Sequence, residues 1–378
     1  QPLPKEYWTR PIDPQLRSWY SIAGNWIARP DNWFAPNNAA PETSHVLWTK
    51  PLDYYGGLTG GLLGPTEVPA SHETGDAYEG KWQSSVIMNG ILYYNRMPAG
   101  FAGSYQPQNG IFAVDLHTGK ELWFRNNTSL SFGQILYFNS FNYDGVYSYL
   151  WDTTTPGIWK AYSPSTGEWL YSMTDVPAGT QYFGPNGEIL ILQADFANHW
   201  MALWNSTAAG QAQLTVLGDF GSWGRFVHGQ TWNAAVKNAY SWNVSIPAGL
   251  QPGMSFFAPV LKVYPDRVMS IAFNDTQVEV WALNTKDLTK NSKSASLLFD
   301  KTWQAPAEWL AGSNTLHYAG ATNDVANGVI SVWNKELRKF YGFSTETGNY
   351  LWETNSEHFL DIYGFGNVEH TWWFAYNH

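Results

Sequence analysis

The chain has no cysteine among its 378 residues. This absence excludes disulfide bonds, covalent haem attachment through a CxxCH motif, zinc sites built on thiolates and catalysis by a thiol. Charged side chains are also scarce, at 14% of residues against roughly 25% in ordinary globular domains. We therefore expect the fold to be held by its apolar and aromatic core.

Positive charge is in short supply as well. The chain has 21 Lys and Arg residues against 31 Asp and Glu residues, which gives a formal net charge of −10, and no basic run is present. Binding to nucleic acid or to an anionic membrane surface is therefore not expected, and a partner should be neutral or basic. No apolar run approaches the roughly 18 residues that a membrane-spanning helix requires, so no membrane span is expected.

Common catalytic and metal-binding motifs are missing too. The sequence contains no HExxH, no GxSxG and no phosphate-binding loop. Its histidines show no pair at metal-ligand spacing on one element, and we predict no metal site. Carboxylate pairs for glycoside cleavage need particular separations in space, which the sequence does not provide. Catalytic residues therefore stay unassigned.

Aromatic residues, in contrast, are abundant, and one aromatic phrase is repeated. "TGKELW" occupies residues 118–123, "TGEWLY" residues 166–171 and "TGNYLW" residues 347–352. Each follows an alternating apolar stretch that is typical of a strand. The Thr-Gly pair predicts a hairpin turn in which Gly119 takes a positive φ. The first two pairs lie 48 residues apart (118 to 166), which suits one four-stranded blade per repeat.

The four-strand plan recurs at five places, and a sixth unit begins near the end of the chain. The stretch "SHVLWTKP" at residues 44–51 resembles an isolated final strand that could complete the last blade. We predict an aromatic, Pro-rich leader over residues 1–43 that wraps the propeller, and an all-β propeller of about six blades over residues 44–378. Helical periodicity is not seen. Incompleteness at the C-terminus, self-assembly and a second polypeptide that completes the ring stay open.

The stretches "VDLHTGKELW" and "FSTETGNYLW" resemble the repeats of quinoprotein-type β-propellers, the PQQ-binding-like repeat proteins. The N-terminal "EYWTRPID" is further similar to exported archaeal members. The resemblance implies a propeller that can belong to a seven- or eight-bladed ring, and a role for Trp48, Trp123 and Trp352 in docking neighbouring blades. It also implies PQQ and calcium. Because that site uses a vicinal disulfide, which this chain lacks, we expect no cofactor.

An extracellular or cell-surface location is expected. The chain opens with "QPLPKEYW", which looks like an end left by removal of a signal peptide. Five asparagines lie in N-x-S/T sequons, which predicts a glycoprotein, although chance can also produce sequons in a chain rich in Asn, Ser and Thr. The five are Asn126, Asn127, Asn205, Asn243 and Asn274.

A long insertion, at about residues 214–237, holds the candidate ligand site. Five side chains there suit stacking on a sugar ring and hydrogen bonding to its hydroxyls, namely Trp223, Arg225, His228, Gln230 and Trp232. A role in packing is an equally good interpretation of the same residues.

Three functions remain open. The leading hypothesis is a non-catalytic cell-surface module that binds a glycan or a cell-envelope protein. A polysaccharide-active enzyme with its site at the propeller axis is the second. A quinone-dependent dehydrogenase is the third.

Overall fold

The computed structural model describes Trp48 and residues 82–96, 110–140, 144–216, 223, 227–255, 258–310 and 314–356. The chain divides into two compact units. The first takes in residues up to 178 together with 183–190 and 205–239, and the second takes in residues 179–182, 191–204 and those from 240 onward. The expected leader, most of the strand at residues 44–51 and the sixth repeat unit lie outside the described residues.

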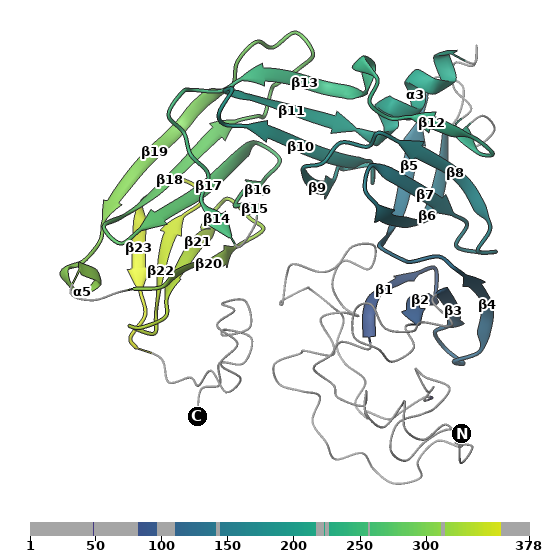
Figure 1. The fold of residues 1–378 in the computed structure, drawn as a ribbon, viewed down its shortest axis with the longest axis horizontal. Coiled ribbons are helices and arrows are strands. Elements are labelled where there is room, and N and C mark those ends of the chain that lie inside the picture. The colour runs from purple at the N-terminus through teal and green to yellow at the C-terminus, as the bar shows by residue number, and fades with distance from the viewer. Residues whose placement is uncertain are drawn as a thin grey trace. The chain divides into compact units, whose positions relative to one another are not determined.

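Two sheets belong to the first unit (Figure 1). One is an antiparallel sheet in the order β1-β2-β3-β4, with the strands β1 (Trp82–Met88), β2 (Ile91–Arg96), β3 (Gly110–Asp115) and β4 (Glu121–Asn126). The other has the order β12-β8-β7-β6-β5, with the strands β5 (Phe132–Asn139), β6 (Asp144–Thr155), β7 (Ile158–Tyr162), β8 (Trp169–Thr174) and β12 (Thr231–Asn233).

Three further sheets follow the same four-stranded plan. The first has the order β13-β11-β10-β9, with β9 (Thr180–Phe183), β10 (Ile189–Asp195), β11 (Trp200–Asn205) and β13 (Tyr240–Ser245). The next has the order β16-β17-β18-β19, with β16 (Lys262–Val263), β17 (Arg267–Asn274), β18 (Gln277–Asn284) and β19 (Ser296–Gln304). The last has the order β20-β21-β22-β23, with β20 (Leu316–Ala321), β21 (Val329–Asn334), β22 (Lys339–Ser344) and β23 (Tyr350–Glu353).

The remaining elements are short. They are a two-stranded pairing of β14 (Met254–Ser255) with β15 (Ala258–Pro259), the helices α3 (Ser206–Val216) and α5 (Ala307–Leu310), and the 3-10 turn η3 (Lys237–Ala239).

These sheets confirm the predicted fold class. The chain is all-β, and its four-stranded, mostly antiparallel sheets are blades of the β-propeller type. The structure is only 7% helical. The eight strands expected around the first two copies of the repeated phrase are all present, as β1 to β8. The short strands β9 and β16 were not predicted, because four and two residues are too few to show an alternating pattern.

The repeated Thr-Gly phrase forms a tight turn between the third and fourth strands of a blade. Gly119 and Gly167 have φ values of 70° and 71°, as predicted for Gly119. The residue three positions before the threonine supports the turn. In the first sheet Asp115 Oδ1 accepts hydrogen bonds from the backbone N–H of Thr118 and from its hydroxyl, both at 2.8 Å. Ser163 Oγ takes the same place in the second sheet, where it accepts from Thr166 N–H.

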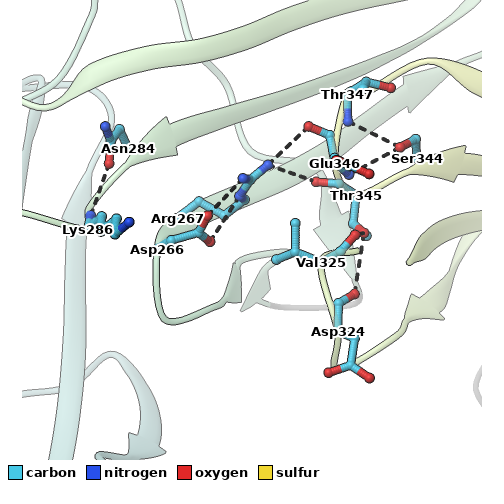
Figure 2. Close-up of polar contacts among 10 residues, drawn as sticks. All are labelled: Asp266, Arg267, Asn284, Lys286, Asp324, Val325, Ser344, Thr345, Glu346 and Thr347. Carbon is cyan, nitrogen blue, oxygen red and sulfur yellow. Dashed lines mark hydrogen bonds and ion pairs between the residues drawn. The ribbon is translucent and has the colours of Figure 1, made fainter. Parts of the chain in front are cut away.

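A charged side chain from the preceding sheet supports the last copy of this turn. Figure 2 shows the guanidinium of Arg267 directed at the turn, where Nη1 donates to the carbonyl oxygens of Thr345 and Glu346 at 3.3 and 3.1 Å. Asp266 holds Arg267 through Nε and Nη2 at 3.0 and 2.8 Å. The Thr345 hydroxyl, which is fully buried, donates to the carbonyl oxygen of Val325 at 2.8 Å. The turn is therefore fixed from both sides.

Apolar and aromatic side chains fill the space between adjacent blades. One cluster in the second unit joins β17, β18, β21 and β22, and includes Met269, Val280, Val332, Tyr341 and Phe343. A cluster in the first unit joins β1, β2 and β3 to the next sheet through residues such as Leu150. Full burial of a large apolar side chain stabilises the fold by roughly 1.5–3 kcal/mol.

The insertion begins earlier than predicted and contains a helix. It occupies residues 206–239 between β11 and β13, and α3 starts at Ser206. Asn205 is the N-cap, since its Oδ1 accepts from the backbone N–H groups of Thr207 and Ala208 at 2.8 and 3.1 Å. The helix carries little amphipathic pattern, so a search for helical periodicity could not find it.

Candidate functional site

In the first unit two tryptophans, Trp48 and Trp123 of β4, dock on Thr-Gly turns. Trp48 Nε1 donates to the carbonyl oxygen of Leu116 at 2.8 Å, and its ring lies against Gly119. Trp123 Nε1 donates to the carbonyl oxygen of Pro164 at 3.1 Å, and its ring lies against Gly167. A glycine is needed because a Cβ would collide with the indole.

The second unit has the same arrangement once, and then an open position. The ring of Phe299 on β19 lies against Gly348 of the following turn. Trp352 on β23 lies across Gly342 of its own sheet and is 40% exposed. Within the part of the chain that the structure describes, no turn is docked on Trp352.

The leucine of the repeated phrase is an unpaired bulge residue on the outer strand. In four sheets a small residue of the third strand faces the docking aromatic, and these pairs are Ala113–Trp123, Ala161–Tyr171, Ala282–Phe299 and Gly342–Trp352. The register then skips one residue in each sheet, and the skipped residues are Leu122, Leu170, Leu298 and Leu351. A β-bulge of this kind re-aims a side chain at a sheet edge.

Three of these four leucines are exposed. The exposed fractions of Leu122, Leu298 and Leu351 are 45%, 42% and 48%, and they lie on β4, β19 and β23, each the outermost strand of its sheet. Leu170 on β8 is covered more fully, because β12 of the insertion pairs with β8. The outer strands therefore present apolar side chains at sheet edges to which, among the described residues, no further strand is added except at β8.

The insertion covers β8 by adding a parallel strand. Figure 1 shows β12 beside β8, and Thr231, Trp232 and Asn233 pair in register with Ser172, Met173 and Thr174. Backbone hydrogen bonds run from Ser172 N–H to the Gln230 carbonyl and from Gly229 N–H to the Leu170 carbonyl. The edge of β13 is covered in part in the same way, by a parallel bridge between Ser245 and Ser294.

A buried polar cluster fastens the insertion to the sheet. Trp223 Nε1 donates to the Tyr149 hydroxyl at 2.9 Å, and this hydroxyl lies 3.0 Å from His228 Nε2. We assign the Tyr149 hydroxyl as the donor and His228 Nε2 as the acceptor of this hydrogen bond. This assignment requires a neutral imidazole that carries its proton on Nδ1. Burial lowers the pKa of the His228 imidazole and so favours that neutral form. Burial likewise raises the pKa of Tyr149 above the usual value.

The candidate ligand-binding residues of the insertion that the structure describes differ in how far they are buried. Trp223 and Trp232 are 2% and 4% exposed, so their ring faces are covered by the protein. The Trp232 ring lies nearly parallel to Tyr171, at 5.9 Å between centroids. His228 and Gln230 are half-buried, and Arg225 lies outside the described residues. In this arrangement the two indoles pack the insertion, and glycan binding by this loop stays a prediction.

The sequons differ in how far their asparagines reach solvent. Asn126, Asn127, Asn243 and Asn274 are exposed, whereas Asn205 is half-buried at the N-cap of α3. Asn274 Oδ1 accepts from Thr276 N–H at 2.9 Å within its hairpin. Glycosylation at these five positions stays a prediction.

Carboxylates converge at two places on the second unit. Lys339 Nζ bridges Glu308 and Glu353 at 3.0 and 3.1 Å, and these two contacts raise its pKa. The pKa of Glu279 is raised by burial and, to a smaller extent, by the charge of Asp300. In the described part of the chain, no group of three or more His, Asp or Glu residues is placed to hold a metal ion. The expectation that the chain holds no calcium or quinone cofactor stays a prediction.

Comparisons with known proteins give only weak structural similarities. No family model matches the chain, and no curated protein matches it. Among solved structures, BamB from Moraxella catarrhalis is 12% identical, with 74% of each chain covered and a TM-score of 0.33. Quinohemoprotein alcohol dehydrogenase from Comamonas testosteroni is 10% identical, with 72% of this chain and 42% of that chain covered and a TM-score of 0.26.

A protein of unknown function from Bacteroides caccae is 12% identical, with 68% of this chain and 72% of that chain covered and a TM-score of 0.29. At these values the comparisons carry no argument about ligand or activity. Among the described helices, none is long and apolar enough to cross a bilayer.

Proposed function

We propose that this chain is a non-catalytic β-propeller module that binds a protein partner along the outer strands of its blades. The observation that carries the proposal is the set of exposed bulge leucines, Leu122, Leu298 and Leu351, each on the last strand of its sheet among the described strands. An outer strand with apolar side chains is a ready template for another chain, and β-strand addition is a common mode of recognition.

The chain's own covering of β8 supports this choice. Where the insertion lies on an outer strand, the bulge leucine Leu170 is less exposed than its three counterparts, and backbone groups of β8 are paired. Burial of apolar side chains with simultaneous pairing of backbone groups is what a protein partner would supply at the other edges. The net charge of −10 favours a partner that is neutral or basic.

We further propose that the module works outside the cell or at the cell surface, with a cell-envelope protein as its partner. The exposed positions of Asn126, Asn127, Asn243 and Asn274 are compatible with glycan attachment, and no described helix could span a membrane. The mass of natively produced protein tests this part, since each glycan adds to the 42.6 kDa of the polypeptide.

A glycan is the second candidate ligand, supported by one aromatic cluster in the second unit. Trp303 and Tyr350 are stacked at 5.0 Å and 10°, and both are partly exposed. Glu353 lies beside them and is bound by Lys339, and Tyr350 donates to its Oε2 at 3.3 Å. Aromatic faces rimmed by charged and hydroxyl groups suit a sugar ring. A glycan array on the parent chain and on Tyr350→Ala tests this candidate.

The enzymatic alternatives have less support. A polysaccharide-active enzyme needs an acid and a base, and the interacting pair Glu279 and Asp300 is the arrangement nearest to this, with one pKa raised. Loss of product release from a polysaccharide panel in Glu279→Gln, with release by the parent, would favour an enzyme. A quinone-dependent dehydrogenase is not supported by the residues described above.

Site-specific photo-crosslinking in the cells that produce the chain tests the proposal. A photoreactive residue in place of Leu122, Leu298 or Leu351 should give an adduct with another protein, and the adduct should disappear when a neighbouring outer-strand residue is changed to aspartate. Asp275, which is exposed in the β17–β18 hairpin, is the matched control position. Adducts at Asp275 as abundant as those on the outer strands would refute the proposal.

A further inference from the structure

We propose that β23 accepts an extended segment of the partner protein as an added parallel strand, with an aromatic side chain of that segment stacked on Trp352. This inference rests on the proposed function, to which it adds the strand, the orientation and the side-chain chemistry. It is carried by the correspondence between β23, whose outer edge no described segment covers, and β8, whose edge the insertion covers.

The strands β8 and β23 have the same construction. Both follow a copy of the repeated phrase, "TGEWLY" and "TGNYLW". Tyr171 of β8 faces Ala161, and Trp352 of β23 faces Gly342, in equivalent registers. A leucine bulge precedes the aromatic residue in each strand. The two edges therefore present the same backbone groups in the same order.

The insertion shows what such an edge accepts. On β8, the carbonyl of Leu170 receives the N–H of Gly229, and the N–H of Ser172 donates to the Gln230 carbonyl at 2.9 Å. Three residues after Gly229, Trp232 stacks on Tyr171 with 13° between the ring planes. The added segment thus places a small residue, Gly229, beside the bulge leucine and an aromatic residue, Trp232, on the docking ring. These two residues of the added segment are three positions apart.

On β23 the corresponding groups are the carbonyl of Leu351, the N–H of Glu353 and the ring of Trp352. Leu351 and Trp352 are 48% and 40% exposed. Among the residues that the structure describes, no backbone hydrogen bond reaches the outer edge of this strand. The Glu353 carboxylate is held by Lys339, so it does not place an unpaired charge at the edge.

The other outer strands lack this combination. On β4 the docking ring of Trp123 is occupied by the turn at Gly167, and on β19 the ring of Phe299 is occupied by the turn at Gly348. An added strand could pair with either edge but could not stack on either ring. In the described part of the chain, β23 alone joins an open edge to an open aromatic ring.

A labelled synthetic peptide with the sequence of residues 227–235, VHGQTWNAA, is the probe. Fluorescence anisotropy should show binding to the full chain. Replacing Trp352 by Ala removes the stacking surface, and Glu353→Pro removes the outward N–H, so each should weaken binding by about three- to tenfold. The controls are Trp169→Ala, an exposed indole on the covered strand β8, and Glu353→Ala, which keeps the N–H.

The absence of cysteine allows the orientation to be measured by disulfide trapping. Leu351→Cys in the chain is paired with peptides that carry a cysteine in place of residue 228 or of residue 235. Parallel addition predicts faster trapping of the first peptide, because Gly229 is the neighbour of the bulge leucine on β8. Faster trapping of the second would show antiparallel addition and overturn the inference.

The remaining outcomes are also decisive. Equal binding to the parent, Trp352→Ala and Glu353→Pro would place the peptide elsewhere and overturn the inference, and so would absence of binding to the folded parent. Dimers in which Leu351 of one copy crosslinks to the insertion of another would make a second copy the occupant and would also overturn it. None of these results removes an adduct at Leu122 or Leu298, so failure here is distinguishable from failure of the proposed function.

Discussion

The indole ring of Trp123 lies against Gly167, the glycine of the turn in the following sheet, and leaves no room there for a side chain. Gly167 has a φ of 71°, so an alanine would suffer both backbone strain and collision with the ring. We predict that Gly167→Ala lowers the free energy of unfolding by about 2–3 kcal/mol, of which about 1 kcal/mol is the strain.

Gly157 supplies the matched control, since its φ is 72° and a Cβ there would meet nothing within 4 Å. Gly157→Ala should therefore show the strain alone, by about 1 kcal/mol in chemical denaturation. In a Trp123→Ala background the two glycine variants should cost the same. A persistent difference in that background would show that the indole is not the obstacle.

Two tryptophans that look equivalent in sequence should respond differently to truncation. Trp123 is half-buried, and its Nε1 is hydrogen-bonded, whereas Trp352 is 40% exposed. We predict a loss of about 3 kcal/mol for Trp123→Ala and under about 1 kcal/mol for Trp352→Ala. Equal losses in denaturant titrations would contradict the exposed position of Trp352.

The repeated phrase made the blades predictable, because an alternating strand, a Thr-Gly turn and a docking aromatic each produce a recognisable sequence pattern. The helix α3 produces no such pattern, since its capping by Asn205 is local and its residues show little amphipathic pattern. Trp223 and Trp232 stood in a loop with sugar-binding composition, but composition does not tell which way an indole faces. The bulge leucines were visible at 122, 170 and 351, yet their meaning required the strand register.

Acid should loosen the insertion. The pKa of His228 is lowered by burial, so its folded value lies below the ordinary 6.5. The stability linked to this group is present above pH 6.5 and is lost as pH falls through the lower folded value. The titratable groups around the ring are the hydroxyls of Tyr147, Tyr149 and Tyr171. Burial raises the pKa of Tyr149 and of Tyr171.

Hydrogen exchange at Ser172 N–H, which the insertion protects, measures this loosening. Its protection should fall as the pH is lowered below 6.5 in the parent, after correction for the intrinsic rate, and should change much less in His228→Gln. The same pH dependence in both proteins would assign it to other groups, such as His317, whose pKa burial lowers to about 4.

The hydrogen bond from Trp223 to Tyr149 should matter more for the insertion than for the blades. Trp223→Phe keeps most of the ring but leaves the buried Tyr149 hydroxyl without this donor. We predict a loss of about 1–2 kcal/mol, seen as faster exchange in β12 while the strands β2 and β3 are unaffected. Uniform acceleration across both sheets of the first unit would instead indicate that the cluster supports the whole unit.

Protection of the outer strands by a partner is the central claim, and hydrogen exchange of the full chain with and without the crosslinked protein tests it most directly. Alone, the chain should show slow exchange at Ser172 N–H, which is paired with Gln230, and fast exchange at Glu353 N–H on the open edge of β23. Addition of the partner should slow Glu353 and leave Ser172 unchanged. If a bound partner left Glu353 and the edges of β4 and β19 as fast as before, and protected other segments instead, the account would be contradicted.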